Sequence, residues 1–175
     1  ILLVARLHPE KGHLEAIEAL SVLHKTHRNC AHLCIVGGGP EQFKQILIAK
    51  AEALEIASFV HIMGVYEDVR PFYYLSDVFT LTSWGTETFS LAALEAMSFG
   101  LPCSLTDIGG AKEMIVEGFN GYLSNSKDVH SIAASWHKIL MNRFDSEQIR
   151  EYVTSHFHLS HMLEQYESLI DKESI

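Results

Sequence analysis

Cysteine is scarce in this sequence, with three residues among 175. Cys30, Cys34 and Cys103 form no CxxC pair, and the last two lie in apolar, strand-like runs. We therefore expect buried, reduced thiols and not a disulfide framework. No apolar run approaches the roughly eighteen residues of a membrane span, and no basic segment followed by a hydrophobic run marks a signal peptide. These absences predict a cytoplasmic protein.

Basic residues are also few, because 13 Lys and Arg stand against 22 Asp and Glu, for a formal net charge of −9. A chain of this sign is a poor match for a phosphate backbone, so nucleic acid is not an expected partner. A small anion held by a few local cations remains compatible with the composition. The hydrophobic share of 47% is that of a globular chain, and 175 residues suffice for one domain with its own core.

Short apolar runs alternate with longer stretches of helical period. Strands are predicted at 1–5, 31–36, 59–63, 77–82 and 101–106, and these runs are continuously apolar. Helices are predicted over 11–26, 41–54, 67–75, 89–99, 111–117, 127–141, 145–154 and 159–171, and no strand is predicted in 118–124. The alternation predicts a single α/β domain over 1–175, with a Rossmann-like, doubly wound parallel sheet.

The unusual residues of the chain concentrate in the turns that follow the predicted strands. Ligands of such sheets bind outside the carboxyl ends of the strands, so this concentration predicts a ligand site there. The first of these turns holds Arg6 and Lys11, two cations that could neutralise a diphosphate. The alternative is a polar loop in which Pro9 and Gly12 reverse the chain.

A glycine-rich turn follows the second predicted strand, at Gly37-Gly38-Gly39-Pro40. Glycine lets the backbone approach a ligand or a neighbouring strand, and the helix that follows favours anions at its start. The pattern is not GxGxxG, and no acid about twenty residues later takes the ribose role of a nicotinamide site. A ligand contact and a tight structural turn both remain open.

Two glutamates, Glu87 and Glu95, lie eight positions apart around the start of the helix predicted over 89–99. Carboxylates so placed suit hydroxyl groups of a ribose or a hexose. Free backbone N–H groups at the start of this helix would add an anion site, and these belong to Thr88, Phe89, Ser90 and Leu91. The alternative is that Glu87 only interacts favourably with the dipole at the start of the helix and that Glu95 is an ordinary exposed helix residue. The apolar neighbours of Glu95 in the sequence weaken this alternative.

The eleven histidines include the cluster HFHLSH, with His156, His158 and His161. No carboxylate or cysteine completes a ligand set there, so we expect exposed or core histidines and no metal site. GxSxG, Walker A and HExxH patterns are absent from the sequence.

Five motifs together resemble the C-terminal domain of the family 4 (group 1) glycosyltransferases, which have the two-domain GT-B architecture. They are ARLHPEKG (5–12), IVGGGPE (35–41), VHIMGVYEDVRPFYYLSDVF (60–79), ETFSLAALEAMSFGLP (87–102) and DIGGAKEMIVEGFNGYL (107–123). The motifs appear in the family's order and cover about two thirds of the chain. The two glutamates separated by seven residues, together with the AMSFGLP that follows them, are a specific signature of the family.

The resemblance implies a site for a nucleoside-diphosphate sugar linked to UDP, GDP or ADP. Arg6 and Lys11 would hold the diphosphate and assist its departure, Glu87 would contact the sugar hydroxyls, and Glu95 the ribose hydroxyls. Backbone amides from Thr88 to Leu91, with Phe89 and Ser90 between them, would meet the phosphates. Gly38 and Gly39 would border the cleft. Transfer in this family retains the anomeric configuration, usually without an essential metal or cofactor.

The resemblance also implies a partner domain. The chain opens directly on ILLVARL without a Met, so we expect a piece of a longer protein whose N-terminal acceptor domain is absent. The whole enzyme would then act on a glycan or lipid-linked acceptor, in lipopolysaccharide or surface polysaccharide synthesis, in the cytoplasm or peripherally at the inner face of the membrane. The isolated chain should bind donor weakly and transfer nothing, and its last helix should pack on the missing domain.

Two positions depart from the family pattern, because Ala5 and Ser90 stand where glycine is usual. Each adds a side chain where the backbone is expected to approach the donor, and the Ser90 hydroxyl could itself contact phosphate or sugar. Two alternatives therefore stay open beside transfer. One is a GT-B relative with other chemistry, such as an epimerase or a phosphorylase, and the other is a binding module with a decayed donor site.

Overall fold

The fold is a six-stranded parallel sheet between two layers of helices. The computed structural model describes residues 1–27 and 31–172, so Cys30 lies outside the described residues. The strands are β1 (Leu2–Val4), β2 (Leu33–Val36), β3 (Val60–Gly64), β4 (Phe79–Leu81), β5 (Cys103–Thr106) and β6 (Gly121–Ser124). They lie in the order β3-β2-β1-β4-β5-β6, and every neighbouring pair is parallel. The predicted Rossmann-like, doubly wound sheet is confirmed.

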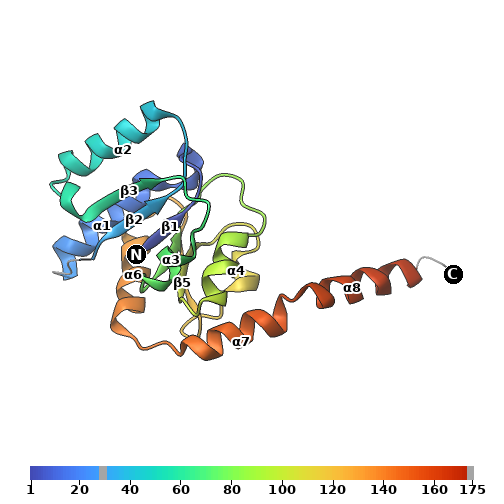
Figure 1. Cartoon of the computed structure of the whole chain (residues 1–175). Helices are drawn as coiled ribbons and strands as arrows, with labels where there is room; N and C mark the ends of the chain where they lie inside the picture. The colour runs from blue at the N-terminus through green and yellow to red at the C-terminus, as the bar shows by residue number, and fades with distance from the viewer. Residues whose placement is uncertain (28–30, 173–175) are drawn as a thin grey trace.

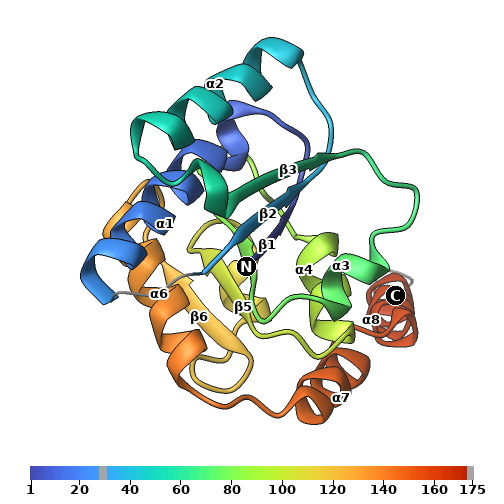
Figure 2. The ribbon, with the colours of Figure 1, turned by 60° about the vertical axis from the view of Figure 1, so that its left-hand side comes forward.

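The helices follow the strands along the chain, as the alternating pattern predicts. They are α1 (His13–His27), α2 (Glu41–Ala53), α3 (Arg70–Tyr74), α4 (Leu91–Ser98), α5 (Ala111–Met114), α6 (Val129–Met141), α7 (Ser146–His156) and α8 (Leu159–Lys172). Figure 2 shows α1 and α6 on one side of the sheet and α3, α4 and α7 on the other. Each side has its own core, because side chains of a strand alternate between the faces.

Neighbouring residues of β1 illustrate this division. Leu3 packs in the core beneath α1 and α6, together with Leu20 and Trp136, while Leu2 packs with Phe79 in the core beneath α4. Leu2, Leu3, Leu20, Phe79 and Trp136 are all completely buried. A strand with apolar side chains on both faces can be stable only between two helical layers, which is why the strands read as continuous apolar runs.

Strand β6 lies within residues 118–124, a segment to which the sequence analysis assigns no element. Gly118, Asn120 and Gly121 give this segment the composition of a turn, but its backbone pairs in parallel with β5. A Cβ atom at Gly121 would lie 1.9 Å from the carbonyl oxygen of Cys103, so the strands approach closely because this residue is glycine. The buried Asn120 amide donates to the Met114 carbonyl (2.9 Å) and accepts from the Val116 N–H (2.8 Å).

Helix α4 also differs from the prediction, because it begins at Leu91 and not near Phe89. The side chain of Ser90 accepts a hydrogen bond from the Ala93 N–H (3.2 Å), and Ser90 is therefore the N-cap. Serine favours the N-cap because its oxygen satisfies one of the first N–H groups, and these have no partner inside the helix.

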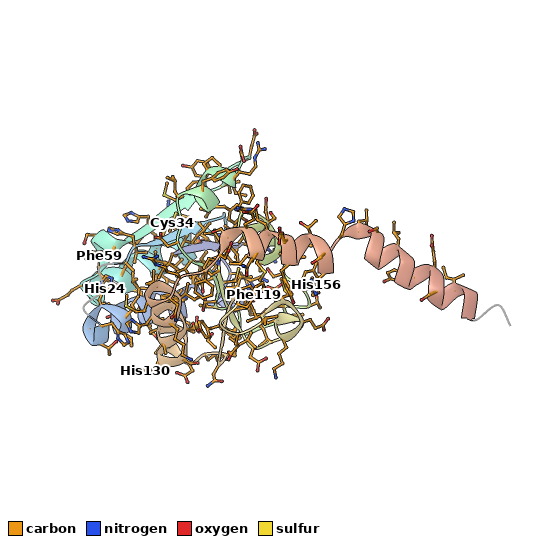
Figure 3. All side chains as sticks on the ribbon, turned by 90° about the horizontal axis from the view of Figure 1, so that it is seen from below. His24, Cys34, Phe59, Phe119, His130 and His156 are labelled. Atoms are coloured by element: carbon orange, nitrogen blue, oxygen red, sulfur yellow. The ribbon has the colours of Figure 1, made fainter. Side chains whose placement is uncertain are left out.

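The C-terminal helix α8 extends away from the rest of the fold (Figures 1 and 3). His156 ends α7 just before the junction with α8, as its label in Figure 3 shows. Leu159, Leu163 and Tyr166 of α8 are exposed, at 49% or more of their surface. Within 1–27 and 31–172, no helix has the length and apolarity needed to cross a membrane.

Candidate functional site

The strand order reverses at β1 and β4, which are parallel neighbours with their carboxyl ends at the same edge of the sheet. The chain runs from β1 to β2 and β3 on one side of the sheet, and then returns to β4 on the other side of β1. The helices that follow β1 and β4 lie on opposite sides of the sheet, and in open α/β sheets ligands bind at such a point. The loop after β1 carries Arg6 and Lys11, and the loop after β4 carries Glu87. The fold therefore brings these three predicted site residues to the same edge of the sheet.

Backbone contacts hold these two loops together. The loop after β1 contains a short 3₁₀ helix, Pro9–Lys11, which ends at Gly12 with a φ of 72°. The Glu10 carbonyl accepts from the Trp84 N–H (2.9 Å), and the Thr82 hydroxyl donates to the Gly12 carbonyl (2.7 Å). A Cβ atom at Gly12 would lie 1.8 Å from the carbonyl oxygen of Thr82. The glycine thus gives both the left-handed backbone and the close approach that the loop pair needs.

The central contact of the site joins Lys11 to Glu87. The Lys11 ammonium donates to Oε2 of Glu87 at 2.7 Å, and about a fifth of each side chain is exposed. Both groups can therefore meet a ligand from solvent while they hold each other in place. Arg6 is exposed and has no ion-pair or hydrogen-bond partner among the described residues. Its guanidinium is free to meet an anion at the same edge.

The start of α4 supplies backbone donors beside Glu87. Ser90 takes the Ala93 N–H, while the N–H groups of Leu91 and Ala92 have no acceptor among the described residues. These two amides, together with the dipole of the helix, favour an anion at this point. Leu91 belongs to the predicted Thr88–Leu91 segment, and Ala92 extends the free donors of the helix by one residue because α4 begins at Leu91. The side chain of Leu91 is 76% exposed.

Glu95 lies one turn inside α4, and its carboxylate is exposed. Ala96 and Met97 are fully buried on the other side of the helix, so the apolar neighbours of Glu95 in sequence do not surround it in space. The sequence argument that Glu95 is poorly placed for an exposed position is wrong for this reason. Its Oε2 accepts a hydrogen bond from the hydroxyl of the buried Tyr73 (3.0 Å). Burial, with help from the Glu95 carboxylate, raises the pKa of Tyr73, so the phenol stays protonated and continues to donate.

The glycine-rich turn after β2 packs against the loop after β1. The Leu7 N–H donates to the Gly38 carbonyl (2.8 Å), and a Cβ atom at Gly39 would lie 2.4 Å from the Leu7 carbonyl oxygen. These contacts favour the structural interpretation of Gly38 and Gly39, while both residues still border the first loop. Ala5 has an ordinary negative φ, so alanine is compatible with the backbone at the position where glycine is usual.

The turn after β5 packs against the loop that follows β4 and carries Glu87. Sequence reasoning missed this role. Gly109 has a φ of 53°, and its Cβ would lie 1.8 Å from the Glu87 carbonyl oxygen. The Gly110 N–H donates to the Thr88 carbonyl (2.7 Å), and Phe89 packs against Gly110. The glycine pair at the end of the neighbouring strand was the available signal. This glycine pair indicates a contact with the loop that carries Glu87 only when β4 and β5 are known to be adjacent.

A small cavity of about 20 Å³ lies beneath this loop, with Glu87, Ser90 and Ser83 among its lining residues. Ser83 is 1% exposed, and its hydroxyl has no hydrogen-bond partner among the described residues. A cavity of this size has room for about one water molecule. Ser83 is a second residue that the sequence analysis did not single out, because a lone serine after a strand carries no pattern.

The clustered histidines near the C-terminus do not assemble a metal site in the described residues. His156 hydrogen-bonds locally to Ser155 and to the carbonyl of Tyr152, and His158 to Ser160, while the side chain of His161 lies outside the description. Across 1–27 and 31–172, no group of three or more His, Cys, Asp or Glu side chains has the geometry to hold a metal ion.

Comparison with known proteins gives a consistent result. Residues 1–156 match the family model described as "Glycosyl transferases group 1". The chain is 34% identical over 143 residues to N-acetyl-alpha-D-glucosaminyl L-malate synthase of Bacillus anthracis, covering 79% of this chain and 37% of that protein. It is 32% identical over 142 residues to glycogen synthase of Mycobacterium tuberculosis, covering 80% and 33%.

A solved structure shares the fold. Anabaena HepE, crystallised in complex with UDP, superposes with a TM-score of 0.83 at 20% sequence identity, covering 98% of this chain and 48% of that one. The chain therefore spans about a third of the length of the curated relatives and about half of this structure.

Proposed function

The chain belongs to the group 1 glycosyl transferase family, and from this premise we propose that it is the donor-binding domain of a retaining glycosyltransferase. In this proposal it forms the C-terminal half of a family 4 GT-B enzyme and binds a nucleoside-diphosphate sugar. A separate N-terminal domain presents the acceptor. The observation that carries the proposal is the Lys11–Glu87 contact, which places a cation and a carboxylate side by side at the point where the strand order reverses.

The diphosphate of the donor would meet Arg6, Lys11 and the free amides of Leu91 and Ala92. When the bond between the sugar and the diphosphate breaks, negative charge grows on the leaving phosphate oxygen. Donors that are already in position stabilise this charge without reorganising, and such electrostatic stabilisation is a major source of catalysis. Two cations and a helix start together supply that charge, so we propose transfer without an essential metal ion.

The two glutamates would hold the two ends of the donor. Glu87 lies beside Lys11 and so adjoins the diphosphate, where its carboxylate can accept hydrogen bonds from hydroxyls of the sugar. Glu95 lies further along α4, where its exposed carboxylate can accept from the hydroxyls of the ribose. Carboxylates accept strongly from hydroxyl groups, and hydrogen bonds to a charged partner are stronger than neutral ones. The UDP bound to Anabaena HepE supports a nucleotide in this fold, and UDP, GDP and ADP are the candidates for this chain.

The first test is nucleotide binding, measured by calorimetry on the 175-residue chain with UDP, GDP and ADP. We expect at least one of them to bind, and Lys11→Met to weaken that binding by about tenfold or more, since it removes a cation from the diphosphate. Lys112→Met is the matched control, because Lys112 forms an ion pair with Asp107 (3.0 Å) after the neighbouring strand. An absence of binding by all three nucleotides at millimolar concentration would favour a binding module with a decayed site.

The second test addresses transfer, in a protein that carries this chain together with an acceptor domain. We expect Lys11→Ala and Glu87→Ala to abolish transfer while the fold remains intact, and NMR of the product to show retained anomeric configuration. The chain without an acceptor domain should bind donor weakly and transfer nothing. A glycan or lipid-linked acceptor of lipopolysaccharide or surface polysaccharide, at the cytoplasmic face of the membrane, is the setting we propose. Epimerisation or phosphorolysis of the sugar would instead identify a relative with other chemistry.

A further inference from the structure

Tyr73 is a buried tyrosine whose hydroxyl reaches the candidate site. Its exposed fraction is 1%, and its ring stacks on Phe99 with centroids 5.2 Å apart and an interplanar angle of 20°. A second ring, that of Phe79 in β4, lies 6.1 Å away. These contacts hold the Tyr73 ring in one orientation beneath α3, so its hydroxyl has a defined position. That hydroxyl donates to Oε2 of Glu95 at 3.0 Å, from a residue 22 positions earlier in the chain.

The hydrogen bond occupies one oxygen of Glu95 and leaves the other available. Oε1 of Glu95 has no partner among the described residues, and the side chain stands on the exposed face of α4. The nearby guanidinium of Arg70 is engaged elsewhere, because it forms two hydrogen bonds with Asp68, at 2.8 and 2.9 Å. Within the described part of the chain, Tyr73 is thus the side chain that orients this carboxylate.

An exposed glutamate without such a contact would sample many rotamers and would lose that freedom when a ligand binds. A rigid, buried donor removes part of this cost in advance, because the carboxylate already has the bound orientation. The remaining oxygen can accept a hydrogen bond from a hydroxyl group of a ligand, whereas the carboxylate would repel a phosphate. The hydroxyls that a nucleotide offers are those of its ribose.

We propose that Tyr73 is a positioning residue for the nucleotide ribose: its hydroxyl holds Oε2 of Glu95 so that Oε1 accepts a hydrogen bond from the 2′- or 3′-hydroxyl. This inference rests on the proposed function, since it requires a nucleoside diphosphate at the carboxyl ends of β1 and β4. It adds a residue to the site that touches no ligand itself. This role differs from a purely structural one in its consequence. Removal of the Tyr73 hydroxyl should reduce the preference for a ribose over a sugar that lacks the 2′- and 3′-hydroxyls.

The test compares the affinities of two ligands for several variants by calorimetry. One ligand is the nucleoside diphosphate that the wild type binds most tightly among UDP, GDP and ADP, and the other is its 2′,3′-dideoxy analogue. For the wild type we expect the analogue to bind about tenfold more weakly, the value of one hydrogen bond to a charged group. Tyr73→Phe keeps the buried ring, and we expect it to reduce this preference to about threefold or less by weakening the ribose ligand alone.

Tyr74→Phe is the matched control, because Tyr74 is adjacent on α3, contacts Phe99 with its ring, and is 77% exposed. It should keep the wild-type preference. Glu95→Ala should remove the preference, and adding Tyr73→Phe to it should change nothing further. Thermal unfolding of each variant verifies that the fold is retained.

Three results would contradict the inference. They are an unchanged preference in Tyr73→Phe, an equal weakening of both ligands in that variant, and a wild type that does not distinguish the ligands. Failure of the wild type to bind any of the three nucleotides would instead overturn the proposed function.

Discussion

The ammonium of Lys11 lies 2.7 Å from a carboxylate oxygen of Glu87, although 76 positions separate the two residues in the chain. In the proposed complex, both groups acquire new partners, since the cation meets phosphate and the carboxylate meets hydroxyl groups. The contact therefore holds the two side chains ready, but it also competes with the diphosphate for Lys11. Glu87 repels the diphosphate as well, because both are negatively charged.

We predict that Glu87→Gln separates these effects. A nucleoside diphosphate without a sugar should bind about three- to tenfold more tightly to the variant, because Lys11 is freed and the repulsion is removed. In the wild type we expect the nucleotide sugar to bind more tightly than the nucleoside diphosphate alone. This difference in affinity should be lost in Glu87→Gln, because Gln accepts hydrogen bonds from hydroxyls more weakly than a carboxylate. Calorimetry with UDP and UDP-glucose measures both. Asp107→Asn is the control, and weaker UDP binding in Glu87→Gln would show that Glu87 positions Lys11 more than it competes with phosphate.

We predict that Gly12→Ala destabilises the chain and displaces Lys11. Its φ of 72° is unfavourable for alanine, and its Cβ would lie 1.8 Å from the backbone of Thr82. We expect a loss of more than about 3 kcal/mol in the free energy of unfolding, measured in urea. Gly64→Ala is the matched control, because Gly64 has a similar φ of 83° and nothing within 4 Å of its Cβ. That variant should lose about 1 kcal/mol, the strain of the backbone alone. Equal losses in the two variants would contradict the packing argument.

The sequence predicts the fold well because the central strands β1, β4 and β5 are buried on both faces. A run such as ILLVA must lie between two layers, and its alternation with helical stretches leaves few other architectures. Strand β6 escapes this reasoning, because Gly121 is selected by the close approach of β5 and not by strand propensity. In the sequence, Gly121 and its neighbours Gly118 and Asn120 cannot be distinguished from the residues of a turn.

The candidate site is predicted less completely, because its contacts join loops that are distant in the chain. Arg6, Lys11 and Glu87 are recognisable as charged residues after strands, but their meeting depends on β1 lying next to β4. The Tyr73–Glu95 hydrogen bond likewise depends on how α3 packs beside α4. In sequence, Tyr73 is one aromatic residue in an amphipathic stretch, and nothing in its neighbours distinguishes it from Tyr74.

We predict that Ser90 acts through helix capping more than through ligand contact. Its oxygen accepts from the Ala93 N–H, and removal of an N-cap by alanine costs about 1 kcal/mol, while glycine costs a few tenths. Ser90→Ala should therefore lower the free energy of unfolding by about 1 kcal/mol, and Ser90→Gly by much less. Both should bind nucleoside diphosphates with nearly wild-type affinity. Selective loss of affinity in Ser90→Ala, with stability unchanged, would instead assign the hydroxyl to the donor.

We predict that His13 makes the chain less stable in mild acid. This residue begins α1 directly after Gly12, it is completely buried against Phe43, and burial lowers its pKa to about 4. Between pH 4 and about 6.5, the unfolded chain therefore binds a proton at this side chain that the folded chain does not bind. Stability must rise with pH across this window. From pH 7 to pH 5, the His13 imidazole alone should account for a loss of about 2 kcal/mol.

Urea unfolding of wild type and His13→Leu at both pH values isolates this effect, because the carboxylates contribute equally to the two proteins. The loss between pH 7 and pH 5 should be smaller in His13→Leu by about 2 kcal/mol. His130→Gln is the control, since His130 is exposed on α6 and should leave the difference unchanged. The same loss in wild type and His13→Leu would mean that His13 gains its proton in the folded chain. In that case its burial must be relieved near neutral pH, because a charged imidazole in a closed apolar site is costly.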